Sequence, residues 1–89
     1  MVYLAQRSVM SKVNWLLKEV MERHRITNRE LAIKLGKHET AISRLKLAKT
    51  LPAIGGEEVI SISDALTELL QARGYDVQVS PKELLSFED

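Results

Sequence analysis

The chain contains no cysteine, and only four of its 89 residues are aromatic. Without cysteine it cannot form a disulfide, a thiol nucleophile or a cysteine-ligated zinc or iron–sulfur site. With so few aromatic side chains, its core has to be mainly aliphatic. No apolar run approaches the roughly 18–20 residues of a membrane span, and the first residues lack the apolar stretch of a signal peptide. We therefore expect a cytoplasmic protein without membrane association.

Charge is divided unevenly along this short chain, although the formal net charge is only +1. Residues 12–49 hold ten basic and four acidic side chains, whereas residues 50–89 hold two basic and eight acidic ones. With 45% hydrophobic and 28% charged residues, the composition is that of one small globular domain. This uneven distribution predicts that the basic part of the chain faces a polyanion and that the acidic part does not. The alternative is that both parts are ordinary solvent-exposed faces.

Apolar residues recur at helical spacing in the first part of the chain. The positions that share this spacing are Val13, Leu16, Leu17, Val20 and Met21. They predict a first helix from Lys12 to His24. Trp15 lies outside this stripe, and we expect it to pack against the C-terminal tail or a partner subunit.

Two further helices are predicted on either side of a glycine. Thr27 and Glu30 have the spacing of a capping box, which opens a helix over residues 28–35. Gly36 follows at the position where a left-handed residue ends a helix. A further helix over residues 39–46 has an apolar face. This face holds Ala41, Ile42 and Leu45. Two short helices joined by such a turn form a helix-turn-helix.

The rest of the chain predicts one long helix and a mixed tail. Residues 57–73 have helical character up to Gly74, although their β-branched opening also fits a strand. Alternating apolar and polar residues allow a short strand over residues 75–79. Ser80 and Glu83 then have capping-box spacing and open a terminal turn.

Residues 28–46 read Asn-Arg-Glu-Leu-Ala-Ile-Lys-Leu-Gly-Lys-His-Glu-Thr-Ala-Ile-Ser-Arg-Leu-Lys. This stretch resembles the helix-turn-helix of lambda-repressor-like regulators, the Cro/cI-type or xenobiotic-response-element family. The positions expected in this family to be apolar, small or glycine are Leu31, Ala32, Gly36, Ile42 and Leu45. The resemblance covers about residues 12–73 and implies sequence-specific binding of double-stranded DNA by a small transcriptional regulator, most simply a repressor. Two residues depart from the family pattern. His38 lies at the cap of the recognition helix, where Ser or Thr is usual. Lys37 lies at a turn position that is often apolar.

In such proteins the second helix of the motif lies in the major groove, with its N-terminal residues at the base edges. The predicted base-contacting residues are Glu39, Thr40, Ser43 and Arg44. Arg44 can make the bidentate contact with guanine, whereas Glu39 can instead complement the dipole of its own helix. The predicted phosphate contacts are Asn28, which the resemblance implies, and Arg29, Lys37, Lys46 and Lys49.

The expected fold is all-α: a compact bundle of four to five helices containing the helix-turn-helix, with a short strand near the C-terminus. Residues 12–73 hold this bundle, residues 1–11 a flexible or dimer-contacting extension, and residues 74–89 a dimerisation element. Because one recognition helix covers a small interface, we expect a homodimer on a pseudo-palindromic operator. The expected dimer contacts are Tyr75, Val77, Val79, Leu84, Leu85 and Phe87.

No cofactor, metal site or catalytic constellation is predicted. His24 and His38 are the only histidines in the sequence, on different elements and without a carboxylate pair at ligand spacing. We therefore expect a binding protein and not an enzyme. The alternative to a DNA-binding regulator is a protein-interaction module, whose acidic C-terminal half binds a partner protein such as a toxin.

Overall fold

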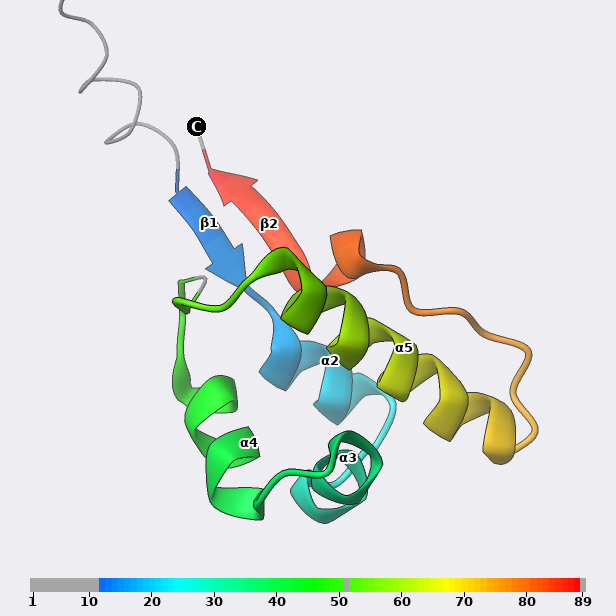
Figure 1. Ribbon diagram of the computed structural model, residues 1–89. Coiled ribbons are helices and arrows are strands. Elements are labelled where there is room, and N and C mark those ends of the chain that lie inside the picture. The colour runs from blue at the N-terminus through cyan, green and yellow to red at the C-terminus, as the bar shows by residue number, and fades with distance from the viewer. Residues whose placement is uncertain (1–11, 51, 89) are drawn as a thin grey trace, which may run out of the picture.

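The structure is a computed structural model that describes residues 12–50 and 52–88 (Figure 1). Its elements in chain order are β1 (Lys12–Trp15), α2 (Leu17–Arg23), α3 (Asn28–Leu35), α4 (Glu39–Leu47), α5 (Gly56–Ala72), the 3-10 helix η1 (Pro81–Leu84) and β2 (Leu85–Glu88). The α-helices confirm the expected all-α bundle, and the two short strands lie side by side at one end of it. The expected extension, residues 1–11, lies outside the described residues.

The two strands form an antiparallel ribbon between the first and last described segments of the chain. Val13 pairs with Phe87, and Trp15 pairs with Leu85. The prediction that the first helix begins at Lys12 is therefore wrong, because the helix begins only with α2. Apolar residues at helical spacing favoured a helix over the whole region. Of these residues only Val13 lies in β1, whose backbone pairs with a strand from the other end of the chain, whereas Leu17, Val20 and Met21 are in α2 as predicted.

The C-terminal part of the chain has its strand in a different place from the one predicted. Residues 75–79 form no strand, and the strand of this region is β2. Figure 1 shows the segment after α5 running back along that helix. The Val79 N–H donates to Thr67 Oγ1 at 2.8 Å, and this hydroxyl lies 3.2 Å from the Val79 carbonyl, to which it donates. The predicted capping box is present at η1, where the Glu83 carboxylate accepts from the Ser80 N–H at 3.0 Å.

The helices α3 and α4 form the predicted helix-turn-helix. Thr27 Oγ1 accepts a hydrogen bond from the Glu30 N–H at 3.1 Å, and the Glu30 carboxylate accepts one from the Thr27 N–H at 2.8 Å. This capping box opens α3 at its predicted first residue. Gly36 ends the helix with a φ of 70°, in the left-handed region that favours glycine.

The long helix is continuous from Gly56 to Ala72, so its β-branched opening is helical and not a strand. Ile62 and Ser63 are fully buried near its middle. The Ser63 hydroxyl donates to the Ile60 carbonyl at 2.9 Å, which satisfies this buried polar group within the helix itself.

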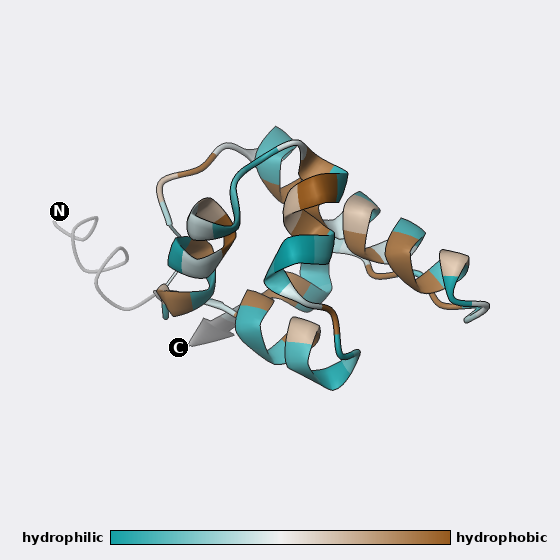
Figure 2. Ribbon diagram, turned by 90° about the horizontal axis from the view of Figure 1, so that it is seen from below, coloured by the Kyte–Doolittle hydropathy of each residue, from teal (hydrophilic) through white to brown (hydrophobic). Residues whose placement is uncertain are grey.

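Figure 2 shows hydrophobic and hydrophilic bands alternating along the helices. The hydrophobic residues of the helices and of the tail form one mainly aliphatic core. Its largest fully buried side chains are Leu17, Met21, Leu31, Ile42, Ile62, Leu66, Leu70, Leu84, Val20, Val79 and Ser63. Trp15 is 2% exposed, and its indole N–H donates to the Leu45 carbonyl at 2.9 Å. Trp15 thus packs within its own chain, paired with the tail through the ribbon and bonded to α4.

The tail is part of this core, which corrects part of the predicted dimer interface. Val79 and Leu84 are 2% and 0% exposed within a single chain. They cannot contact a partner without opening the core, so their assignment to a dimer surface is wrong. Leu85 packs against the same core, whereas Tyr75 remains exposed. The side chain of Phe87 lies outside what the structure describes.

Candidate nucleic-acid interface

The outward side of α4 carries the side chains predicted to contact bases. Ile42 is fully buried and fixes this helix to the core. Glu39, Thr40 and Arg44 are exposed, and Ser43 is half-buried. Within the described part of the chain, the Arg44 guanidinium has no hydrogen-bond or ion-pair partner. All of its donors are therefore available for a base edge.

The start of α4 has no side-chain cap. His38 has the extended backbone of an N-cap residue, with φ −81° and ψ 152°, but its side chain forms no capping hydrogen bond. Its carbonyl accepts from the Ala41 N–H at 3.0 Å, which begins the helical hydrogen bonding. The first amide groups of α4 are therefore left to solvent or to a ligand.

Two predicted phosphate contacts, at the start of α3 and near the end of α4, are joined directly. Lys46 Nζ donates to Asn28 Oδ1 at 2.9 Å. Because the amide oxygen is used in this bond, the Asn28 NH₂ group keeps its two donors, and the ammonium keeps two more. The pair therefore forms a compact group of donors, which is what binding of a phosphate oxygen requires.

The remaining phosphate candidates differ in their surroundings. Arg29 and Lys49 are exposed, and neither side chain has a partner among residues 12–50 and 52–88. Lys37 Nζ lies 3.2 Å from Glu58 Oε2, so this lysine links the turn of the motif to α5. A phosphate contact by Lys37 would have to break this ion pair, which is weak because both side chains are partly exposed.

One lysine that the sequence pattern did not single out lies beside the same helices. Lys18 lines a cavity of about 380 Å³ together with Lys46 and Lys49. The three lysines come from α2, from α4 and from the segment that follows α4, and Glu19 in the same wall offsets part of their charge. Lys18 lies on α2 and comes beside Lys46 and Lys49 only through the tertiary fold, so no local signal could have identified it.

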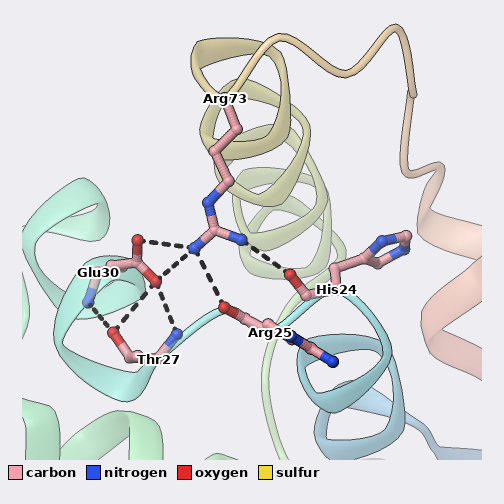
Figure 3. Close-up of polar contacts among 5 residues, drawn as sticks. All are labelled: His24, Arg25, Thr27, Glu30 and Arg73. Carbon is pink, nitrogen blue, oxygen red and sulfur yellow. Dashed lines mark hydrogen bonds and ion pairs between the residues drawn. The ribbon is translucent and has the colours of Figure 1, made fainter.

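Arg73, directly after α5, holds the turn in front of α3 (Figure 3). Its guanidinium donates to the carbonyl oxygens of His24 and Arg25 at 2.8 and 3.1 Å. It also donates to both carboxylate oxygens of Glu30 at 2.7 Å. The backbone N–H of Thr27, and next to it Arg73, lower the pKa of Glu30 because both stabilise its charged form. This network fixes the point at which α3 begins, and sequence reasoning missed Arg73 entirely.

The described residues contain no group of three or more side chains able to hold a metal ion. None of the described helices is long and apolar enough to cross a bilayer.

Comparisons of this chain with protein-family models, with curated proteins and with solved structures found no match. What the chain can bind therefore has to be inferred from its own side chains and their arrangement.

Proposed function

We propose that the protein binds double-stranded DNA in a sequence-specific manner, as a small transcriptional regulator that acts as a repressor. In this proposal α4 lies in the major groove, where Arg44 contacts a guanine and Thr40 and Ser43 contact neighbouring bases. Asn28 and Lys46 hold the phosphate backbone beside it. The function is one of binding, without catalysis and without a cofactor.

The observation that carries the proposal is the hydrogen bond between Lys46 and Asn28 within the helix-turn-helix. It joins the helix with the base candidates to the first residue of the preceding helix. A phosphate held by this pair would therefore lie next to the helix whose exposed side chains meet the bases. The exposed Lys18 and Lys49 line one cavity with Lys46 and extend the basic surface beyond the two helices of the motif.

The operator that suits this function is pseudo-palindromic and is bound by two copies of the chain. One recognition helix makes a small interface, of about 600–1,000 Å² of protein surface for a single module. Two copies related by a two-fold axis would place their recognition helices in successive major grooves, with half-sites about 34–36 Å apart or a multiple of this distance.

The test is a selection from random duplexes, followed by fluorescence anisotropy at low and at moderate salt. The full chain should enrich a defined site, prefer it to random duplex and lose affinity steeply as salt increases. Arg44→Ala should cost about 1–3 kcal/mol of binding free energy and relax the preference at one base pair. Lys46→Ala should weaken binding to all duplexes and reduce the salt slope by about 1.

Lys82→Ala is the matched control, because Lys82 is exposed, lies on η1 and carries the same charge. It should leave both affinity and base preference unchanged. Equal binding to every duplex would contradict a sequence-specific regulator. No binding at either salt would overturn the whole proposal in favour of a protein-interaction module, whose complex Arg44→Ala should leave intact.

A further inference from the structure

The end of α2, the end of α5 and the segment after α5 line a cavity of about 270 Å³ that contains none of the proposed DNA contacts. Its polar lining residues are Arg23, His24, Arg25 and Tyr75. The other lining residues are Leu70, which belongs to the core, and Val77, which packs against the core. The lining is therefore mainly polar, with a smaller apolar part.

The two arginines give this lining its charge. Both side chains are exposed, and neither forms a hydrogen bond or an ion pair within the described part of the chain. Each guanidinium offers five N–H donors in a fixed fork, and the His24 ring and the Tyr75 hydroxyl add further donors. Glu22 and Asp76 are their neighbours in sequence, but no acidic residue among those described lines the cavity. This combination of donors and positive charge is suited to an anion.

The turn that carries Arg25 is held in a rare backbone conformation. Its φ is 56°, in the left-handed region, and glycines are the only other described residues with a positive φ. The guanidinium of Arg73 donates to the carbonyls of His24 and Arg25 at 2.8 and 3.1 Å and so fixes this conformation. Figure 3 shows the His24 and Arg25 side chains pointing away from Glu30. Backbone strain held in this way is typical of ligand sites, because it sets the side chains in place before the ligand binds.

A phosphate monoester matches this lining better than a carboxylate does. It carries a charge of about −1.5 to −2 at neutral pH and three oxygens that accept hydrogen bonds. Guanidiniums bind such oxygens in pairs, and two guanidiniums balance the charge of the dianion. A carboxylate has a single charge and two oxygens, so it would leave one of the two arginines largely unused.

The apolar part of the lining and the Tyr75 ring indicate what the phosphate is attached to. Tyr75 is 58% exposed and lines the same cavity as Leu70 and Val77, so its ring can cover a flat organic group that lies against them. The volume of about 270 Å³ lies below the range of about 300–1,000 Å³ that is typical of small-molecule pockets. The organic group is therefore small, of the size of a single ring.

We propose that this cavity binds a small phosphate monoester. Arg23 and Arg25 hold the phosphate, and the organic group lies between Tyr75 and the apolar part of the lining. The site shares no residue with α4 or with the pair of Lys46 and Asn28. It is therefore a function in addition to DNA binding and does not rest on it.

Titration of the full chain with phenyl phosphate, followed by the backbone amide signals in NMR spectra, tests this site. The signals of residues 23–25 and 75–77 should shift together and saturate at millimolar ligand. Inorganic phosphate lacks the ring, and benzoate lacks the second negative charge. Each should therefore bind about tenfold more weakly than phenyl phosphate.

Substitutions of the two arginines test their role. Arg23→Gln and Arg25→Asn each remove one guanidinium and should raise the Kd of phenyl phosphate about tenfold. Asparagine is among the residues best tolerated in the left-handed conformation of position 25. Tyr75→Ala should weaken binding of phenyl phosphate but not of inorganic phosphate. Lys82→Gln is the matched control, because it removes one positive charge from exposed η1 and should leave the Kd unchanged.

Circular dichroism checks that each variant is folded. The proposal would be overturned by the absence of a saturable shift at residues 23–25, or by shifts confined to Asn28 and Lys46. Equal affinity for inorganic phosphate would refute an organic ester, and equal affinity for benzoate would refute a phosphate site. None of these readouts involves DNA, so their failure leaves the proposed DNA binding standing. A failed selection from random duplexes likewise leaves this site standing.

Discussion

Arg73 connects three parts of the chain through one guanidinium: the end of α5, the turn after α2 and the start of α3. Glu30 contributes both carboxylate oxygens to this guanidinium while it also caps α3 through the Thr27 N–H. Because these contacts favour the charged carboxylate, the pKa of Glu30 lies below its ordinary value of 4.5. At the scale of single residues, the network should therefore make part of the stability dependent on pH.

Glu30→Gln keeps the capping geometry but removes the negative charge. We expect the free energy of unfolding at neutral pH to fall by about 0.5–1 kcal/mol, because the pair with Arg73 is partly exposed. A lowered folded-state pKa gives stability that is present above 4.5 and is lost as pH falls through the folded value. The deficit of the variant should therefore shrink in acid.

Urea unfolding followed by circular dichroism, at neutral pH and below the carboxyl range, measures this difference. Asp64→Asn is the control, because Asp64 is exposed on α5 and has no partner among the described residues. A deficit of Glu30→Gln that is equal at both pH values would show that the carboxylate charge contributes nothing.

Trp15 is a second residue that connects elements distant in sequence, because it pairs with Leu85 of β2 and donates a hydrogen bond to Leu45 of α4. Trp15→Phe keeps most of the buried ring but removes the indole N–H that donates to the Leu45 carbonyl. We expect a loss of about 1–2 kcal/mol in the free energy of unfolding, from the missing hydrogen bond and the smaller ring. Urea unfolding followed by circular dichroism measures it, with Tyr75→Phe as an exposed aromatic control. A variant as stable as the wild type would contradict a structural role for the indole N–H.

At the scale of elements, the bounds of α3 could be predicted because the signals that set them lie within the helix or next to it. Thr27 and Glu30 close the capping box, and Gly36 supplies the left-handed end. The exposed side of α4 could be predicted because helical spacing places Ile42 in the core. The strand β1 could not be predicted, because its partner strand β2 lies at the other end of the chain.

The two helices of the motif differ in how they begin, and this difference has a measurable consequence. His38 has N-cap backbone geometry without a capping bond, whereas Thr27 caps α3. His38→Ser should therefore raise the free energy of unfolding by about 0.5–1 kcal/mol, and Thr27→Ala should lower it by about 1 kcal/mol. Thermal unfolding followed by circular dichroism compares the two variants with the wild type. No gain from serine at position 38 would show that the start of α4 is already satisfied in solution.

At the scale of the whole molecule, the tail completes the core of the helical bundle. Val79 and Leu84 are buried among the helices, and β2 pairs with β1. The sequence could not reveal this, because an apolar residue that faces its own core has the same local pattern as one that faces a partner. Lys18 and Arg73 were missed for a related reason, since both meet their neighbours only through the tertiary fold.

A chain that ends at Arg73 tests whether the tail is needed for folding. It lacks Val79, Leu84 and β2, and burial of each of these two side chains contributes about 1.5–3 kcal/mol. A small domain has a total stability of only about 5–15 kcal/mol, so the shortened chain should be largely unfolded or unfold at much lower urea. Far-UV circular dichroism and urea unfolding measure this against the full chain.

Tyr75→Ala in the full chain is the control and should shift stability by at most about 0.5 kcal/mol, because that side chain is exposed. Cooperative unfolding of the shortened chain at the urea concentration of the full one would contradict a core that includes the tail.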